Sequence, residues 1–182
     1  MKFELVVALL SCLVFAGCIG SEGSPPPAAQ LAAAGDTVRI NYVGRLEDGA
    51  VFDTSLENEA IKAGLPLRPK YELLEFVVGS GAVIKGFDDA VLGMSAGEFK
   101  TVSISPENGY GDRDESLVME YPKSVFQNNG SNLEVGQYIM SRSGQQGKVV
   151  VVGAENFTVD YNHFLAGRTL TFEITLVELV KG

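Results

Sequence analysis

The sequence predicts an α+β fold, in which a mainly antiparallel sheet has one short helix against it and a small, mainly β domain is inserted near the end. Two observations support this prediction. Between residues 36 and 116, short segments alternate apolar and polar side chains with the period of two that is typical of half-buried strands. A stretch of different character, residues 117–161, follows, and residues 162–179 then supply a last strand that belongs with the first segment.

The first part of the chain begins with a predicted hairpin. Residues 37–42 alternate apolar and polar side chains, residues 47–49 supply a turn, and Val51 begins the return strand. Residues 56–69 then fit a short helix followed by a loop with prolines, and residues 72–78 resume as a strand.

An apolar stripe predicts the helix that packs against the sheet. Its members stand at the i, i+3, i+4 and i+7 spacing of one helical face: Phe87, Ala90, Val91 and Met94. Gly97 ends this unit. Strands are expected again over residues 99–105 and 170–176, because both stretches alternate apolar and polar side chains.

The inserted stretch, residues 117–161, has turns and strands of its own. Turns are expected at residues 128–130 and 143–144, where Asn, Gly and Ser gather. The clearest strands are residues 149–152 and 157–159.

The first residues are typical of an export signal. Lys2 precedes an almost wholly apolar run, residues 5–16, which is shorter than the roughly 20 residues that span a bilayer but suits a secretory signal. Residues 15–18 resemble a prokaryotic lipobox, which predicts that residues 1–17 are removed and that Cys18 is lipidated. The alternative is an uncleaved membrane anchor. Either one places the protein outside the cytoplasm, attached to a membrane.

Residues 18–34 predict a flexible tether behind the lipidated cysteine. Apart from Cys18 this stretch has almost no large side chain, and Pro25–Pro27 make it semi-rigid at one point. Folded structure is expected to begin near Gly35. Because Cys12 would leave with the signal, the mature chain would hold a single thiol and no intramolecular disulfide.

Composition argues against several kinds of site. The net charge of −9 and the lack of a basic run argue against binding of nucleic acid. His163 is the single histidine and no cluster of carboxylates accompanies it, so no metal site is predicted. No cofactor is expected, and the chain is expected to be a monomer.

A set of aromatic and aliphatic side chains with one acid stands out in the main domain. Periodicity alone leaves open whether these residues form only a core or also line a pocket: Tyr42, Phe52, Asp53, Phe76, Val83, Ile84, Phe87, Tyr110 and Phe172.

Most of these residues lie in motifs that resemble, in order and spacing, those of the FKBP-type peptidyl-prolyl isomerases. The motifs are Asn41-Tyr42-Val43-Gly44, Phe52-Asp53-Thr54-Ser55, Gly81-Ala82-Val83-Ile84-Lys85-Gly86-Phe87 and Gly109-Tyr110-Gly111, and Leu170-Thr171-Phe172-Glu173-Ile174 is similar to the closing strand of that family. The resemblance covers nearly everything from Gly35 onward. It implies a twisted antiparallel half-barrel with one short helix, formed by residues 35–116 and 162–182.

The inserted domain, residues 117–161, resembles the flap of the SlyD-like branch, which holds unfolded chains. Residues 121–126 and 162–167 carry this likeness, and the long stretch 56–69 is similar to the longer archaeal members. Two positions depart from the family: Phe87 stands where many members have Trp, and Leu74 stands where some have an aromatic residue. The sequence ends without a metal-binding tail rich in His and Cys, so nickel delivery is not expected.

The resemblance also implies roles for the pocket residues. The backbone N–H of Ile84 would hold a substrate carbonyl near the proline, and Tyr110 would donate its hydroxyl to the substrate backbone. Asp53 would orient Tyr42 or the carbonyl dipole of the twisting bond. The apolar surface that receives the substrate would comprise Phe52, Leu74, Phe76, Val83, Phe87 and Phe172.

In the insert, a second set of side chains is expected to capture unfolded segments: Tyr121, Val125, Phe126, Tyr138 and Met140. The same residues could equally form the small core of the insert, Phe126 above all. The sequence thus predicts a membrane-tethered prolyl isomerase with chaperone activity, which acts on unfolded or proline-containing polypeptides and helps exported proteins fold. The alternative is a non-catalytic holdase or a peptide-binding surface lipoprotein.

Overall fold

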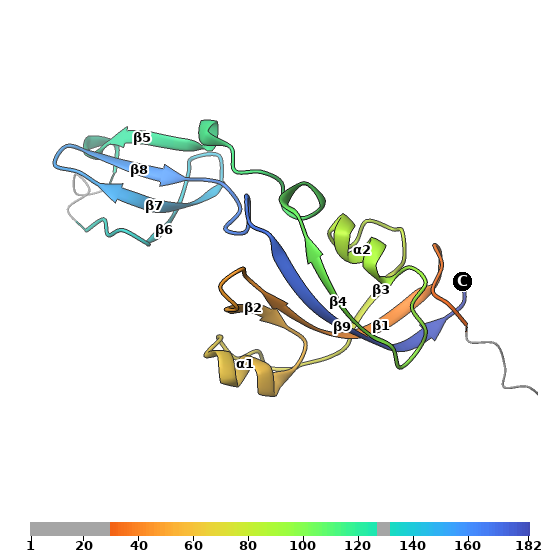
Figure 1. Cartoon of the computed structure of the whole chain (residues 1–182). Helices are drawn as coiled ribbons and strands as arrows, with labels where there is room; N and C mark the ends of the chain where they lie inside the picture. Colours follow the sequence, from red (N-terminus) through yellow and green to blue (C-terminus); the bar gives the residue numbers. More distant parts are fainter. Residues whose placement is uncertain (1–29, 127–131) are drawn as a thin grey trace, which may run out of the picture.

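The computed structural model describes residues 30–126 and 132–182, which form two antiparallel sheets. Figure 1 shows the sheets apart from each other, joined by the segment that follows β4 (Phe99–Ile104) and the segment that precedes β9 (Leu170–Val180). All four strands of the second sheet lie, in sequence, between β4 and β9.

The first sheet has five strands, with β2, β1, β9 and β4 in that order and β3 paired with β1. Its remaining bounds are β1 (Thr37–Arg45), β2 (Val51–Thr54) and β3 (Leu74–Val77). One edge of β1 is shared, because β3 pairs with residues 37–40 and β2 pairs with residues 43–45. The strands predicted from alternation are therefore confirmed, and all their pairings are antiparallel.

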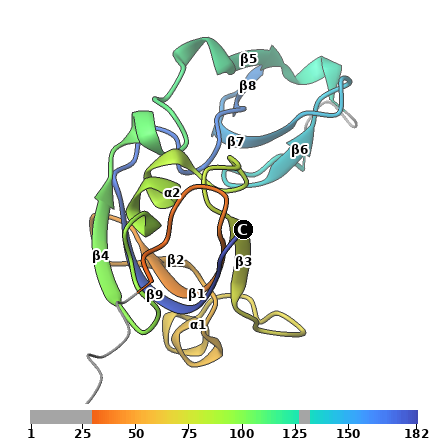
Figure 2. The same ribbon diagram turned by 90° about the vertical axis from the view of Figure 1, so that its right-hand side faces the viewer.

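The last strand, β9, lies between β1 and β4 and carries the clearest alternation in the chain. Its buried side chains are Leu170, Phe172, Ile174 and Leu176, each at most 5% exposed. They enter one core together with residues of β1, β3 and α2 (Lys85–Val91). Figure 2 shows the strands of the first sheet curving around α2.

The predicted apolar stripe is buried, although α2 is shorter than the stripe. Leu92 takes an extended ψ of 131° and Gly93 a positive φ of 77°, so the helix ends at Val91. Met94 lies beyond the helix and is still fully buried against the sheet. Gly86 allows this packing, because a Cβ there would lie 2.5 Å from Cγ2 of Ile104 at the end of β4.

The expectation of one helix in the fold class is wrong. A second helix, α1 (Glu57–Ala63), contacts β2, at the place where residues 56–69 predicted a short helix followed by a loop. Ala60 is its one buried residue, so α1 lacks the apolar stripe that marks α2 in the sequence. Gly64 ends α1 in the left-handed conformation, with a φ of 67°.

The second sheet has four strands, in the order β5, β8, β7, β6. Their bounds are β5 (Val118–Pro122), β6 (Tyr138–Met140), β7 (Gln146–Val152) and β8 (Asn156–Asp160). They surround a small core of their own: Leu133, Val149, Phe157 and Val159. The strands predicted at residues 149–152 and 157–159 are confirmed, and the predicted turn at 143–144 joins β6 to β7. The turn predicted at 128–130 lies outside the described residues.

Three short 3₁₀ turns occur in the same half of the chain: η1 (Pro106–Asn108), η2 (Glu115–Leu117) and η3 (Lys123–Val125). The first two lie on the path from β4 to β5, and the third follows β5.

Folded structure begins earlier than Gly35, so the tether expected over residues 18–34 is wrong for its last residues. Ala32 is 4% exposed in the main core, and its N–H donates to the carbonyl of Met94 at 2.8 Å. Its small side chain, which suggested a linker, is what lets it pack there. The predicted signal, residues 1–17, and Cys18 lie outside the described residues.

Both ends of the described fold meet at the carboxylate of Asp36, which is 4% exposed. It accepts hydrogen bonds from the N–H of Ala33 at 2.8 Å, from Nζ of Lys181 at 2.6 Å and from the N–H of Gly182 at 3.1 Å. These bonds lower the pKa of Asp36, with the Lys181 ammonium as the largest cause. Figure 1 places this meeting point at the end of the molecule remote from the second sheet. Within residues 30–126 and 132–182, no helix is long and apolar enough to cross a membrane.

Candidate active site

A cleft of about 440 Å³ opens over the face of the first sheet that α2 covers. Most of the residues predicted for the prolyl site line this cleft. Gly81 and Ala82, from the loop before α2, also line it. The lining residues are Tyr42, Phe52, Asp53, Leu74, Gly81, Ala82, Val83, Ile84, Phe87, Tyr110 and Phe172. The aromatic and aliphatic set therefore serves as core and pocket at once.

Phe172 forms the centre of the aromatic floor. Its ring meets that of Phe87 edge to face with centroids 5.0 Å apart, and that of Phe52 in the same way at 5.6 Å. Gly44 makes room for this arrangement, because a Cβ there would lie 2.7 Å from Cζ of Phe52. The cleft thus has a fixed apolar floor.

One predicted residue of the apolar surface, Phe76, lies behind the cleft. It is 6% exposed and packs against Phe87, with ring centroids 6.1 Å apart, but does not line the cleft. Its side chain lies on the face of β3 that packs into the main core. Phe76 therefore supports the ring of Phe87 from the core and has no surface in the cleft.

Tyr42 and Asp53 form the polar side of the cleft. The Tyr42 hydroxyl donates to Oδ2 of Asp53 at 2.8 Å, and the N–H of Thr54 donates to Oδ1 at 2.8 Å. Burial, followed by the carboxylate that accepts its proton, raises the pKa of Tyr42 to about 12. The hydroxyl therefore remains a hydrogen-bond donor throughout the neutral pH range.

The residues after Asp53 hold β1 beside it. The hydroxyl of Thr54, which is 1% exposed, donates to the Tyr42 carbonyl at 2.7 Å. The Ser55 hydroxyl accepts from the Tyr42 N–H at 2.9 Å. Thr54 and Ser55 thus fix the backbone from which Tyr42 projects.

Sequence reasoning missed Arg68, which forms an ion pair with Asp53 from the loop after α1. Its guanidinium also donates to the Thr54 carbonyl at 3.4 Å and lies 5.9 Å from the ring centre of Tyr71. One signal was available, a single basic residue between Pro66 and Pro69, but alternation says nothing about where such a loop folds.

The loop before α2 presents the backbone of Ile84 to the cleft. Asp88, 8% exposed, accepts the Gly79 N–H with both carboxylate oxygens, at 2.8 and 3.0 Å, which ties the start of this loop to α2. Ile84 has φ −59° and ψ 145° and immediately precedes the helix. Its N–H donates no hydrogen bond within the described part of the chain.

Tyr110 also lines the cleft, and the ring of His163 supports it. The two rings are stacked face to face, 4.1 Å apart and 2° from parallel. Nδ1 of His163 accepts the N–H of Leu165 at 3.2 Å, which fixes the plane of the imidazole. Partial burial raises the pKa of Tyr110, with a smaller contribution from the charge of Asp53, and partial desolvation lowers the pKa of His163. Sequence reasoning missed this contact, because no local pattern shows that His163 and Tyr110, which are far apart in the chain, stack on each other.

The residues expected to capture unfolded segments do not all lie together. Four of the five line a cavity of about 490 Å³ on the second sheet: Tyr121, Val125, Phe126 and Met140. The rings of Tyr121 and Phe126 pack on buried Phe157, at 5.6 and 5.8 Å, while Val125 and Met140 are 57% and 65% exposed. Side chains that pack against the core of the second sheet therefore also line this cavity.

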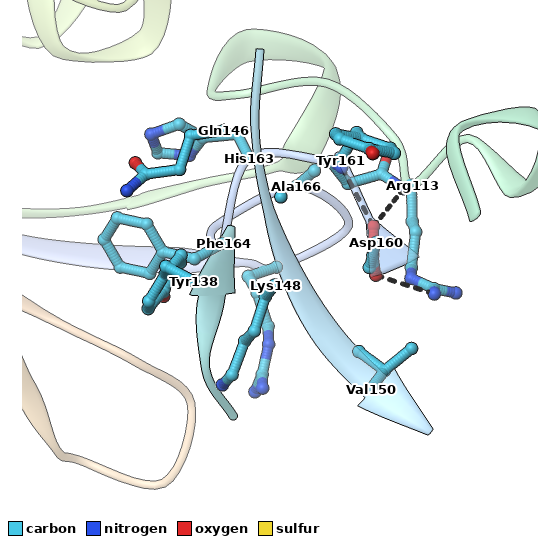
Figure 3. Close-up of a pocket in the computed structure, with 13 residues that line it drawn as sticks. Arg113, Tyr138, Gln146, Lys148, Val150, Asp160, Tyr161, His163, Phe164 and Ala166 are labelled. Carbon is cyan, nitrogen blue, oxygen red and sulfur yellow. Dashed lines mark hydrogen bonds and ion pairs between the residues drawn. The ribbon is translucent and has the colours of Figure 1, made fainter. Parts of the chain in front are cut away.

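Tyr138 lines a different cavity, together with Phe164 and Lys148 (Figure 3). Alternation along β6 cannot tell which of two neighbouring cavities a side chain reaches. Among residues 30–126 and 132–182, no group of three or more His, Cys, Asp or Glu side chains could hold a metal ion.

Comparison with known proteins decides the family. The family model for the FKBP-type peptidyl-prolyl cis-trans isomerases, FKBP_C, matches residues 28–177, which include every residue of the cleft. This chain belongs to that family. It is an FKBP-type peptidyl-prolyl cis-trans isomerase, and proline-containing polypeptides are the substrates of such enzymes.

Three relatives illustrate the range of likeness. A short-type peptidyl-prolyl cis-trans isomerase of Methanocaldococcus jannaschii is 44% identical over 142 residues, which are 77% of this chain and 88% of the relative. The FKBP-type isomerase SlyD of Yersinia pestis is 33% identical over 143 residues, 77% of this chain and 66% of SlyD. A probable FKBP-type 16 kDa isomerase of Pseudomonas fluorescens is 30% identical over 146 residues, 78% of this chain and 87% of the relative.

These likenesses refine one expectation. The stretch 56–69 suggested the longer archaeal members of the branch, whereas the archaeal relative is named a short-type isomerase. In this FKBP-type isomerase the stretch holds α1 and the loop that carries Arg68 to Asp53. A helix and a loop of this kind account for its length.

The stacked pair at the cleft predicts a pH dependence. Since His163 is the single histidine, and its pKa is lowered, kcat/KM should fall as the pH drops below about 6.5. Protonation of Nδ1 removes the acceptor for the Leu165 N–H, and the ring that supports Tyr110 is released. His163→Phe, which can still stack but does not titrate, should lose this decline. The rates are measured by NMR exchange on a peptide without titratable side chains.

His163→Ala is the companion variant. It should lower kcat/KM at every pH, because Tyr110 loses the ring that stacks against it. Identical pH profiles for the wild type and His163→Phe would show that the imidazole plays no part in holding Tyr110.

Proposed function

We propose that this FKBP-type isomerase is a membrane-tethered folding helper for exported proteins, in which the cleft isomerises prolyl bonds and the second sheet captures unfolded segments. Residues 35–116 and 162–182 would form the isomerase domain, and residues 117–161 an inserted flap domain. The observation that best supports this division is that each sheet has its own core.

The chemistry asked of the cleft is rotation about one bond. The barrier is about 18–20 kcal/mol, because the amide loses resonance when it twists, and the unaided reaction takes tens to hundreds of seconds. No nucleophile or base is required. The twisted amide is less polar than the planar one, so an apolar site that excludes water binds it better than the ground state. The edge-to-face rings of Phe52, Phe87 and Phe172 supply such a floor.

Two polar groups beside this floor suit an extended substrate. The N–H of Ile84, which donates no hydrogen bond within the described part of the chain, would donate to the carbonyl of the residue near the proline. The Tyr110 hydroxyl, 40% exposed as a residue and protonated at neutral pH, would donate to the substrate backbone. Together they hold the flanking chain while the prolyl bond turns.

The pair of Tyr42 and Asp53 would face the carbonyl that rotates. Asp53 is held by hydrogen bonds from Tyr42 and Thr54 and by the Arg68 ion pair, so its carboxylate has a fixed direction. A fixed dipole needs no reorganisation as the carbonyl turns, which favours the twisted state.

Removal of either polar group should slow tetrapeptide isomerisation without stopping it. We expect Tyr110→Phe and Asp53→Ala each to lower kcat/KM by about two- to tenfold, the effect of one lost hydrogen bond. Glu178→Ala is a matched control, because it removes a surface carboxylate that pairs with Arg39 outside the cleft. Thermal denaturation checks that each variant is folded. Full activity in both cleft variants would show that these roles are misassigned.

The second sheet has a surface suited to unfolded chains. Its cavity of about 490 Å³ is bordered by the exposed Val125 and Met140 and by the rings of Tyr121 and Phe126. Met is adaptable, and exposed apolar side chains around a hollow favour binding of varied apolar segments. Capture there would raise the concentration of a client's prolines at the cleft.

Deletion of residues 117–161 should separate the two activities. The chain can be rejoined, because the N–H of Tyr161 already donates to the Leu117 carbonyl at 3.0 Å and the N–H of Asp114 to Oδ1 of Asn162 at 2.8 Å. Tetrapeptide isomerisation should persist, whereas acceleration of a proline-limited protein refolding should largely disappear. The two rates are measured side by side, and an equal loss in both would contradict a division of labour.

Attachment to a membrane is proposed from the sequence alone, on the apolar run at residues 5–16 and Cys18. If Cys18 is lipidated, the expressed full chain should partition into detergent and incorporate a labelled fatty acid. Cys18→Ser should abolish the label. A label-free wild type that still pellets with membranes would indicate an uncleaved N-terminal anchor instead.

A further inference from the structure

A cavity of about 710 Å³ lies next to the prolyl cleft and has no role in the function proposed above. Figure 3 shows its lining residues, which come from β6, β7, β8, the segment before β9 and, with Arg113, the segment between β4 and β5. The side chains that matter for its chemistry are Arg113, Tyr138, Lys148, Asp160, Phe164 and Arg168.

The cavity and the cleft share one wall. Tyr110 lines the cleft and His163 lines the cavity, and their rings are stacked 4.1 Å apart. A polypeptide that left the cleft over this ring pair would therefore meet the cavity next. Extended chain advances about 3.3–3.6 Å per residue, so residues a few positions from the proline would reach it.

The charge of the cavity is opposite to that of the chain as a whole. Three cations line it against one carboxylate, in a protein with a net charge of −9. Arg113 is occupied, because it pairs with Asp160 at 2.8 Å and also with Glu115. Lys148 and Arg168 are exposed and form no ion pair among the described residues.

Two exposed rings stand beside these free cations. Phe164 is 64% exposed and Tyr138 is 55% exposed, and Figure 3 shows both on the side of the cavity toward which Lys148 extends. Rings offer contact area to the aliphatic part of a side chain or to backbone, and unpaired cations select a carboxylate. The combination suits an acidic stretch of polypeptide.

We propose that this cavity binds an acidic segment of the same chain whose proline occupies the cleft, and that Lys148 and Arg168 make the isomerase prefer prolines with Asp or Glu a few residues away. The inference rests on the isomerase activity and is independent of the tether and of the capture surface on the second sheet. Its occupant is the substrate itself, because only a segment joined to the bound proline is held beside the ring pair.

The test uses peptides with one proline and one variable residue, Glu, Gln or Lys, placed two to six residues away on either side. On the full-length enzyme at low salt, kcat/KM for the best Glu position should exceed that for Gln by about threefold, and Lys should fall below Gln, as for exposed charge pairs. The difference should shrink as salt screens the charges. Equal rates for the three peptides at every position would overturn the proposal, while turnover of the Gln peptide shows that the cleft itself works.

Charge reversal locates the effect. Lys148→Glu and Arg168→Glu should remove or invert the preference for Glu while leaving a tetrapeptide, which is too short to reach the cavity, unaffected. Lys62→Glu is the matched control, because it makes the same charge change at a 70% exposed site on α1. An equal loss of preference in the control would mean that net charge, and not this cavity, sets the effect. If a cavity variant fails to fold, the salt series on the wild-type enzyme still decides between preference and none.

Discussion

The antiparallel pairing of β9 with β1 and β4 is the interaction on which the rest of the structure depends. β9 fills the middle of the first sheet, pairing with β1 from Thr37–Val180 to Arg45–Thr171 and with β4 on its other side. It carries Phe172 into the centre of the cleft, where the rings of Phe52 and Phe87 meet it. Because β9 comes last in the chain, the sheet and the active site are completed together, after every residue of the second sheet has been made.

Period-two alternation predicted β1 and β9 well, because alternate side chains of both strands are buried in the main core. Residues 170–176 are the clearest case, with alternate side chains at most 5% exposed. The cleft could be located from the sequence only through family motifs. Tyr42, Asp53 and Tyr110 are far apart in the chain, and periodicity cannot distinguish a buried ring from one that lines a pocket.

The features that the sequence did not reveal lie where long-range packing decides the position of a loop or of a single side chain. Arg68 reaches Asp53 because the loop after α1 folds back over β2, which no local pattern encodes. His163 lies under Tyr110 because two segments on either side of the inserted strands return to the same place. Ala32 was predicted to belong to the tether but is buried. A small side chain is common both in tethers and in tightly packed contacts, so the residue type does not distinguish them. Each case needs a contact between residues distant in sequence.

The meeting of both ends of the described fold at Asp36 has a mechanical consequence. Thr37 and Val180 are paired at the open end of the β1–β9 ladder, so the chain enters β1 and leaves β9 side by side. Hydrogen bonds of an antiparallel pair run perpendicular to the strands. A force that pulls these two ends apart first breaks the contacts of Asp36 with Lys181 and Gly182. It then acts on the hydrogen bonds between β1 and β9 one after another, starting at Thr37 and Val180. The fold resists such a force weakly, because the hydrogen bonds of the ladder break in sequence and not together.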